Sequence, residues 1–330
     1  MKSKKVMEIK RLITIICLMT FVNNINAQQE RQVSQFMYDN ISINPGYAGS
    51  YDMILASAIY RNQWLGFGDG APQNIILNLD APFKLFKRTH GIGLSIFTDN
   101  IGFNKDVNLS LSYAYQINVG NGKLGIGLSA GFYNRNLDPD WYFTAEGNPN
   151  DNAIPQGKNN AWIYDMGIGL FYKTEELYIG ISSTHLFQDA FVFQSEGTAI
   201  STETDERLFR HYYLTAGYRF QLSNPSFEFL PAMLVESQIQ PEGAMFRCDL
   251  NSTLRYNKKV WAGVSYRIGS EVIGMVGLEI LNGVKIGYSY DFETTALSNH
   301  SKGSHEILIS YAFMLGVEKA TQKYKSIRFL

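Results

Sequence analysis

The stretch Val107-Asn-Leu-Ser-Leu-Ser-Tyr-Ala-Tyr-Gln-Ile-Asn-Val119 alternates apolar residues with small or polar ones at every position. Successive side chains of a β-strand point to opposite faces of a sheet, so this segment has one apolar face and one polar face. The same period of two recurs at 124–132, 260–268 and 284–290. The pattern predicts long amphipathic strands as the main element of the fold.

Fourteen such segments follow one another, and no convincing helix lies between them. They lie near 52–61, 72–81, 90–98, 106–119, 122–133, 161–173, 176–185, 209–221, 226–239, 243–256, 259–268, 271–280, 283–291 and 304–315. Many are longer than the roughly 5–6 residues usual in globular strands. Their polar faces are rich in Gly and Ser, which fits a crowded barrel interior better than the surface of a soluble β-sandwich. We therefore expect an all-β fold, a transmembrane antiparallel β-barrel of about 14 strands over residues 52–316.

The connections sort by length when these segments are numbered from the N-terminus. Those after even-numbered segments are mostly short, with 82–89 as a moderately long exception. Those after odd-numbered segments include the longer stretches 62–71, 99–105, 134–160, 186–208 and 292–303, with 240–242 and 269–270 short. Outer-membrane barrels have short periplasmic turns and longer external loops. The sorting therefore predicts that both termini are periplasmic.

The first 27 residues have the features of a secretory signal peptide. Five basic residues precede the apolar stretch from Leu12 to Val22, and the polar stretch after it ends in the small residue Ala27. The apolar stretch is too short to span a bilayer, which takes about 20 helical residues. Cys17 follows the bulky Ile16, which argues against a lipid-bearing cysteine. Cleavage near Ala27 leaves Cys248 as the only cysteine, so no internal disulfide is expected.

Processing also changes the charge. The whole chain has 29 basic and 30 acidic residues, and the segment 1–27 holds five basic residues and one acidic residue. The mature chain then has a net charge of −5, which argues against nucleic-acid binding. We expect a signal peptide over 1–27, a periplasmic lead-in segment over 28–51, the barrel over 52–316 and a periplasmic tail over 317–330, in a protein integral to the bacterial outer membrane.

No motif for catalysis, a cofactor or a metal stands out. The glycines from Gly125 to Gly131 alternate within a strand that no helix follows, so they are not a nucleotide-binding loop. They are interpreted as small inward-facing residues that leave room for lumen contents. The same interpretation applies to Gly91, Gly93, Gly167 and Gly169. The histidines have no close ligand spacing, and the acidic and amide residues of 134–160 fit a turn-rich loop better than a calcium site.

The lead-in segment holds a cluster of turn-forming residues, Asn44-Pro45-Gly46-Tyr47-Ala48-Gly49. Pro45 fixes a bend, and the two glycines permit tight turns. Phe36, Met37 and Tyr38 precede the cluster, and linkers rarely hold so many residues that favour burial. We therefore predict an ordered segment that enters or caps the barrel from the periplasmic side.

These motifs resemble a known family. Gln35-Phe-Met-Tyr38 and Ile43-Asn-Pro-Gly-Tyr-Ala-Gly49 are similar to the opening of the PorP/SprF family of Bacteroidetes type IX secretion membrane proteins, in which Ala usually stands at the place of Gly46. Further similar motifs are Arg61-Asn-Gln-Trp64, Gly70-Ala-Pro72, Leu79-Asp-Ala-Pro82, Gly91-Ile-Gly-Leu94 and Asp99-Asn-Ile-Gly102. They cover about the first third of the chain, and beyond it the resemblance rests on barrel patterning.

The resemblance implies an outer-membrane barrel that works with the type IX secretion apparatus and has no enzymatic activity or cofactor. Members of the family serve secretion or surface retention of particular large proteins, often gliding adhesins. The implied partners are the C-terminal domain of a secreted adhesin-type client, other type IX secretion components and the outer-membrane bilayer.

Two groups of residues are candidates for partner contacts or for a structural role. The first comprises Asn44, Pro45, Gly46, Tyr47, Ala48, Gly49, Arg61 and Trp64. The second comprises Phe187, Phe191 and Phe193 of the predicted outer loop, since an exposed apolar patch usually marks a contact, although this stretch could also fold into the lumen. Two other functions stay open: a passive porin-like channel for small solutes, and an enzyme on the barrel rim.

Overall fold

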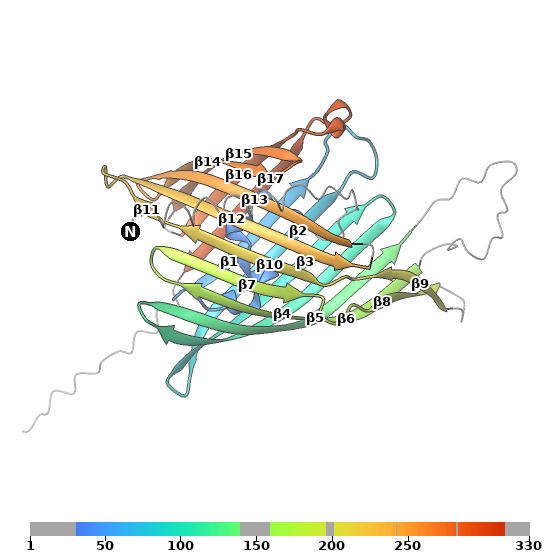
Figure 1. Ribbon diagram of the computed structural model, residues 1–330, viewed down its shortest axis with the longest axis horizontal. Helices are drawn as coiled ribbons and strands as arrows, with labels where there is room; N and C mark the ends of the chain where they lie inside the picture. The colour runs from blue at the N-terminus through green and yellow to red at the C-terminus, as the bar shows by residue number, and fades with distance from the viewer. Residues whose placement is uncertain (1–30, 139–158, 196–200, 242, 282, 314–330) are drawn as a thin grey trace, which may run out of the picture.

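The computed structural model describes residues 31–138, 159–195, 201–241, 243–281 and 283–313. Within these residues the strands form one sheet that runs around the molecule (Figure 1). The strands are β1 (Ile54–Asn62), β2 (Gln73–Leu85), β3 (Arg88–Ile101), β4 (Asn104–Val119), β5 (Gly122–Leu137), β6 (Asn159–Lys173), β7 (Leu177–Thr184), β8 (Ala190–Ser195), β9 (Ser201–Arg207), β10 (His211–Tyr218), β11 (Phe220–Gln221), β12 (Phe227–Gln240), β13 (Gly243–Tyr256), β14 (Val260–Arg267), β15 (Glu271–Leu281), β16 (Val284–Glu293) and β17 (Ser304–Phe313). The short helices are η1 (Phe36–Tyr38), α2 (Asn40–Ile43), η2 (Pro45–Tyr47) and η3 (Ala296–Asn299). None of the described helices is long and apolar enough to cross a membrane.

The sheet closes on itself because its first and last strands pair. β1 pairs antiparallel with β17 from Ile54↔Phe313 to Asn62↔His305, and with β2 along its other edge. Fourteen strands make up the wall. β8 and β9 form a hairpin beyond it, with β8 paired to the start of β6, and β11 continues β10 beside β12. The prediction of a closed antiparallel barrel of about 14 strands is confirmed.

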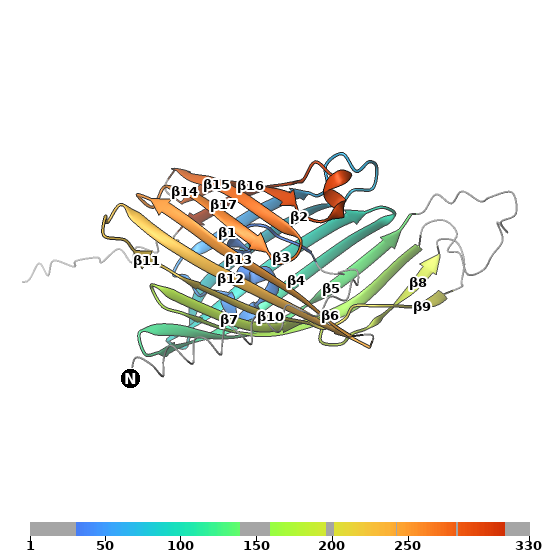
Figure 2. The same cartoon turned by 45° about the horizontal axis from the view of Figure 1, so that its top comes forward.

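The two ends of the barrel differ in their connections (Figure 2). One end, which we call the turn end, carries tight turns such as Phe86-Lys87 and Asn257-Lys258, in which all four residues have positive φ. This geometry matches the twist of a hairpin. The opposite end, which we call the loop end, carries the longer links and the β8–β9 hairpin. The division of the connections into a mostly short set and a longer set, which the sequence predicted, therefore corresponds to the two ends of the barrel.

The predicted link at 82–89 is wrong in length. β2 continues to Leu85 and β3 begins at Arg88, so a two-residue turn joins them. Pro82 is tolerated inside β2 because β1 pairs with β2 only as far as Asp80. Beyond that point no described strand pairs with this edge of β2, and a missing N–H costs little on such an edge. The apparent exception to the short turns disappears.

Two predicted loops at the other end also contain more strand than expected. The stretch 99–105 is mostly paired, because the ladder between β3 and β4 extends to its last possible pair and leaves only Gly102-Phe103 as the link. The stretch 186–208 is not all loop, since it contains the β8–β9 hairpin. Alternation is weak at both places, so the sequence pattern underestimates the strand length there.

The outer face of the wall is apolar and the inner face is polar. Along β2, Ile75, Leu77 and Leu79 are 43–45% exposed, whereas Asn74, Asn78 and Asp80 on the opposite face are buried. An apolar outer band with a polar interior is the arrangement of a barrel surrounded by lipid. The wall therefore places its polar side chains toward the lumen.

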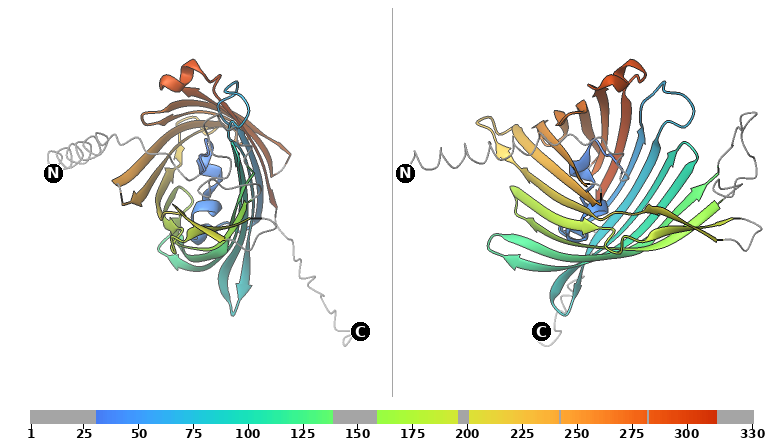
Figure 3. Two further views of the ribbon diagram at one scale, coloured as in Figure 1. Left: turned by 90° about the vertical axis from the view of Figure 1, so that its right-hand side faces the viewer. Right: turned by 45° about the vertical axis from the view of Figure 1, so that its right-hand side comes forward.

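Residues 31–51, which we call the lumen segment, lie inside this wall (Figure 3). Their apolar side chains complete small clusters with inward-facing wall residues. Val33 packs in one cluster and Phe36 with Ile43 in another; the buried wall partners are Ile59, Ile76, Phe97, Leu308, Tyr213 and Leu234. The hydrophobic core of the protein is thus distributed between the lumen segment and the wall.

The lumen segment runs through the barrel and does not merely cap one mouth. At its start, the Arg31 guanidinium lies 5.0 Å from the centre of the Phe97 ring, in the loop-end half of β3. At its finish, Tyr51 lines the turn end, where β1 begins. The segment is ordered, as predicted. It also runs from the loop-end half of the lumen to the turn end, whereas the sequence predicted only a segment that enters or caps the barrel from the periplasmic side.

Candidate functional site: a filled lumen and its vestibule

The motif Asn44 to Gly49 forms a compact, mostly buried turn in the lumen. Pro45 starts η2, where its fixed φ suits the first position of a helix. The side-chain oxygen of Asn44 caps this turn by accepting a hydrogen bond from the Gly46 backbone nitrogen at 2.9 Å. Gly49 has φ +66, which lets the chain reverse toward β1. The turn residues singled out from the sequence therefore shape the lumen segment.

Glycines of the wall provide the space in which this motif sits. A Cβ built on Gly127 would lie 2.5 Å from the Pro45 carbonyl oxygen, and closer still to the neighbouring backbone carbon and nitrogen. A Cβ built on Gly91 would lie 2.0 Å from the Ala48 carbonyl oxygen, and one built on Gly125 would lie 2.0 Å from the Gly46 carbonyl oxygen. The structure thus brings together the alternating glycines and the turn motif, which the sequence had presented as separate features.

Hydrogen bonds between the motif and the wall hold the motif in place. The Asn44 amide donates to the Leu170 carbonyl oxygen at 3.0 Å. The Ser182 hydroxyl donates to the Ile43 carbonyl at 2.7 Å, and the Gln116 amide donates to the Ala48 carbonyl at 2.7 Å. The Ser182 and Gln116 bonds satisfy carbonyl groups that a buried turn would otherwise leave without partners, at a cost of about 1–3 kcal/mol each.

Arg61 lies at the centre of a buried ionic cluster in the loop-end half of the lumen. Its Nη1 lies 2.6 Å from an Asp291 oxygen and 3.6 Å from a Glu306 oxygen. The same carboxylates bind the lumen segment: the Ser34 hydroxyl donates to Asp291 at 2.7 Å, and the backbone nitrogens of Ser34 and Gln35 donate to Glu306 at 2.8 and 2.9 Å. Buried charges are tolerated only when they are paired, so this cluster joins the lumen segment to β1, β16 and β17.

A second arginine repeats this arrangement on the neighbouring strands. Arg267 donates from Nε to Asp249 at 2.9 Å and also pairs with Glu271. Its other nitrogens donate to the Gln32 side chain at 3.1 Å and to the Val33 carbonyl at 3.3 Å. The start of the lumen segment is therefore fixed to β13–β15 as well as to β16 and β17.

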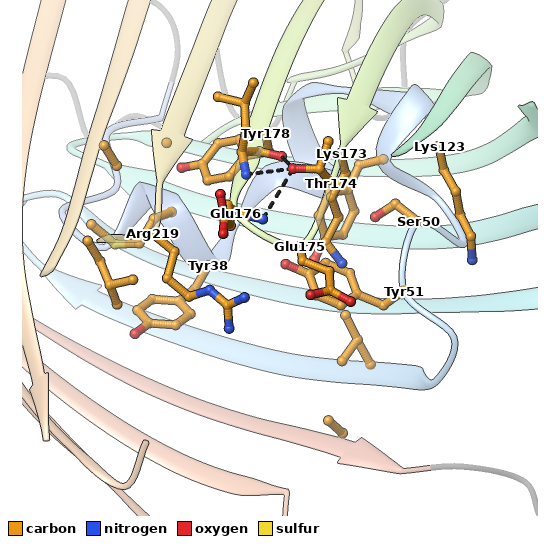
Figure 4. Close-up of a pocket in the computed structure, with 18 of the residues that line it drawn as sticks. Tyr38, Ser50, Tyr51, Lys123, Lys173, Thr174, Glu175, Glu176, Tyr178 and Arg219 are labelled. Carbon is orange, nitrogen blue, oxygen red and sulfur yellow. Dashed lines mark hydrogen bonds between the residues drawn. The ribbon is translucent and has the colours of Figure 1, made fainter. Parts of the chain in front are cut away.

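At the turn end the lumen opens into a cavity of about 880 Å³, which we call the vestibule. Tyrosines of the lumen segment and of β7 line it, and Figure 4 shows Tyr38, Tyr51 and Tyr178 around the space. Basic side chains complete the lining: Lys123, Lys173, Arg219, Arg255 and Lys285. The vestibule is thus formed jointly by the lumen segment and by inward-facing wall residues.

The charges of the vestibule are unevenly neutralised. Lys123 pairs with Asp52 at 2.7 Å near the rim, and Arg255 pairs with Glu228 at 2.6 Å. The Lys173 ammonium lies 3.0 Å from the centre of the Tyr51 ring, in a cation–π contact. Burial raises the pKa of the Tyr51 hydroxyl. That side chain therefore stays a neutral hydrogen-bond donor at physiological pH.

The three phenylalanines predicted in the outer loop differ in position. Phe191 is fully buried, packs with Tyr133 and lies under the Arg135 guanidinium at 4.5 Å. Phe187 is 53% exposed. Phe193 belongs to β8, and its side chain lies outside the described residues. The stretch is therefore not one exposed apolar patch, because Phe191 folds inward.

Trp64 lies at the loop end, just after β1. Its backbone has φ 54, and its nitrogen donates to the Ser304 hydroxyl at 3.2 Å. The indole nitrogen donates to Glu293 at 3.0 Å. Trp64 therefore joins the β1–β2 link to the ends of β16 and β17, which is a structural position at the rim.

The described residues include no group of three His, Cys, Asp or Glu side chains that could hold a metal ion. The possible calcium ligands of the loop 134–160 fall mostly outside the described residues, because 139–158 is not among them. Sequence reasoning missed Ser34, Asp291 and Glu306, and it also missed Lys173 and Tyr178 of the vestibule. For the four wall residues, the available signal was charge or aromaticity on the Gly/Ser face of a strand, which alternation directs into the lumen.

The sequence profile described as type IX secretion system membrane protein PorP/SprF matches residues 25–311. The chain belongs to this family. The likeness seen in the first third of the sequence therefore extends through the lumen segment and almost the whole wall. As a PorP/SprF member with this fold, the protein is an outer-membrane β-barrel of the type IX secretion system. No match was found among curated protein sequences.

Solved barrels with a similar course of the chain include proteins of several kinds. The CymD monoaromatic hydrocarbon channel is 15% identical, with a TM-score of 0.48, over 84% of this PorP/SprF chain and 92% of that one. The Ralstonia pickettii toluene transporter TbuX is 11% identical, with a TM-score of 0.47, over 83% and 93%. The translocator domain of the autotransporter NalP from Neisseria meningitidis is 13% identical, with a TM-score of 0.45, over 79% and 87%.

Proposed function

We propose that this PorP/SprF protein is a non-enzymatic partner barrel that supports secretion or surface attachment of one large secreted protein, such as an adhesin. The observation that carries the proposal is the filled lumen. Residues 31–51 occupy the space that a solute channel would need, and they are held by buried ion pairs and hydrogen bonds. A barrel built in this way offers its two ends and its rim as surfaces for other proteins.

Deletion of the gene tests the proposed function directly. Surface proteins of the deletion strain are labelled with a membrane-impermeant biotin reagent and quantified by mass spectrometry. We expect one large surface protein to disappear, while other type IX cargo stays at its wild-type level. A complemented strain provides the control. Unchanged levels of every surface protein would contradict the proposal, and loss of all type IX cargo would indicate a general role in export.

The porin-like channel is the alternative, and conductance separates the two. Because the lumen segment fills the barrel, we expect the purified protein to be silent in planar bilayers at moderate voltage. A steady, ohmic pore in every insertion event would favour a solute channel. The vestibule does not change this expectation, since it is open toward the turn end and bounded by the lumen segment on its inner side.

We also propose that the turn end, where β17 finishes and the C-terminal tail begins, faces the periplasm. Lys87 lies in a tight turn and Phe103 in a short link at the opposite end. In intact cells, a membrane-impermeant maleimide should label Phe103→Cys and spare Lys87→Cys; the reverse labelling would overturn the orientation. Cleavage near Ala27 predicts that N-terminal sequencing of the mature protein begins at Gln28.

A further inference from the structure

We propose that the vestibule is a receptor site for an acidic peptide segment, contributed by a second protein on the turn side of the membrane. This proposal rests on the proposed function in one respect, because it assumes that the barrel has a protein partner on the turn side of the membrane. It concerns a defined cavity and a defined ligand chemistry, so it is tested with purified protein, apart from the identity of any surface client.

Two lysines give the inner part of the vestibule its charge. Among the described residues, no carboxylate lies within 4.0 Å of the ammonium group of Lys173 or Lys285. Arg255 and Arg219 share the single carboxylate of Glu228. The remaining acidic groups of the lining are Asp80, which accepts a hydrogen bond from the Gly49 backbone nitrogen at 3.2 Å, and Asp52, Glu175 and Glu176. Five basic and five acidic side chains thus surround the vestibule, and Glu279 is the cross-strand neighbour of Lys285. The two inner lysines differ from the other basic groups in that no described carboxylate makes an ion pair with them.

The direction of these side chains excludes a simpler explanation. Basic residues at the rim of a barrel often face the headgroups of surrounding lipid. Lys173, however, is on the same face of β6 as the fully buried Phe171, and Lys285 is on the same face of β16 as Asp291. Alternation directs both lysines into the lumen. Lipid packed around the outer wall therefore cannot neutralise them.

The rest of the lining suits a peptide. Tyr38 and Tyr51 present aromatic rings, and the Tyr178 hydroxyl and the Ser50 hydroxyl have no hydrogen-bond partner within the described part of the chain. These hydroxyls can donate to a carboxylate or to a peptide carbonyl. A cavity of about 880 Å³ lies within the range of about 300–1,000 Å³ typical of ligand sites. It can hold a short extended segment but not a folded domain.

The C-terminal tail of this chain is the other possible occupant, and its charge argues against it. Ala312, at the end of β17, lines the vestibule, so the tail 314–330 begins close to the site. The tail carries four basic residues, Lys319, Lys323, Lys325 and Arg328, against the single acid Glu318. Like charges repel, so a basic tail would not neutralise Lys173 or Lys285. An acidic segment from a partner matches the site better.

Fluorescence anisotropy with the full mature protein in detergent tests the proposal. The probe is a fluorescein-labelled peptide, Glu-Phe-Glu-Glu-Phe-Glu, and its control is the same peptide with Gln at every Glu. We expect saturable binding of the acidic peptide, at least about tenfold weaker binding of the Gln peptide, and an affinity that falls as salt screens the charges.

Matched variants identify the site. The pair Lys173→Gln and Lys285→Gln should weaken binding of the acidic peptide at least tenfold, whereas Lys173→Arg with Lys285→Arg should keep it. The pair Lys87→Gln and Lys258→Gln removes the same charge from exposed turn tips and should leave binding unchanged. Heat-modifiable migration in gels verifies that each variant is folded.

Several results would overturn the proposal. They are the absence of binding, equal binding of the two peptides, and equal losses from the vestibule pair and the turn-tip pair. Removal of residues 317–330 provides a further test. If it raises affinity tenfold or more, the tail occupies the vestibule and the partner segment does not. Loss of a client in the deletion strain bears only on the proposed function, so the two failures are distinguishable.

Discussion

A methyl group added at Gly127 should dislodge the lumen segment. In Gly127→Ala the new Cβ would stand 2.5 Å from the Pro45 carbonyl oxygen, where ordinary contact needs 3.4 Å or more. The colliding atoms are backbone on both sides, and β5 is paired on both edges, so no side chain can rotate to relieve the contact. The motif must move away from the wall by about 1 Å.

The size of the effect follows from what that movement costs. Overpacking a close-packed contact destabilises it by about 1–3 kcal/mol. A shift of this size also stretches the bonds from the Asn44 amide to Leu170 and from Gln116 to Ala48, now 3.0 and 2.7 Å long. Each is worth about 1 kcal/mol. A total near 2–3 kcal/mol raises the population with a displaced lumen segment on the order of 30- to 150-fold.

Planar-bilayer recording measures this population as the frequency of opening events. We expect Gly127→Ala to open far more often than the wild type and to lose its folded gel migration at a lower temperature. Gly274→Ala is the matched control, because a Cβ there meets nothing within 4 Å. The reasoning is refuted if Gly127→Ala matches both the wild type and Gly274→Ala in conductance and in heat resistance.

Three further substitutions should separate buried contacts from exposed ones. Arg61→Met leaves two buried carboxylates without their cation, so thermal stability should fall by about 3–5 kcal/mol; a fall no larger than that of Arg88→Met, at an exposed site, would contradict this. Asn44→Ala removes a cap and a bond to the wall, which should cost about 1–3 kcal/mol and increase protease cleavage within the lumen segment. Phe191→Ala should cost about 3–5 kcal/mol in a buried cluster, whereas Phe187→Ala, at a half-exposed site, should be nearly neutral in the same melting assay.

The wall was predictable because its signal is local. Alternation between apolar and small residues repeats along one strand and does not depend on which strand lies beside it. The end of β2 was not predictable, because the tolerance of Pro82 depends on how far β1 extends alongside it. The different positions of Phe191 and Phe187 could not be predicted from the sequence pattern either. His185 and Gln188 both have positive φ, so the chain turns between β7 and β8, and the period of two no longer tells inside from outside.

The contents of the lumen were predictable only in part. Inward-facing glycines and an ordered aromatic segment are both visible in the sequence, but nothing in the sequence shows that Gly127 lies against Pro45. The ionic cluster is harder still, because Arg61 precedes its partner Asp291 by 230 positions. Vestibule residues such as Lys173 lie at strand ends. There, a charged side chain on a polar face cannot be told from the sequence apart from an ordinary solvated residue of the barrel rim.

The contacts of Ser34 have a consequence for the order of assembly. Its backbone nitrogen bonds to Glu306, 272 positions later in the chain, on the strand that also closes the barrel by pairing with β1. Contacts of such long range form late, because the entropy of closing the intervening loop must be overcome first. The lumen segment therefore docks only when the last strand is in place, and seam closure and docking of the lumen segment become one cooperative step. A barrel that closed empty would trap the carboxylates of β16 and β17 without their lumen partners.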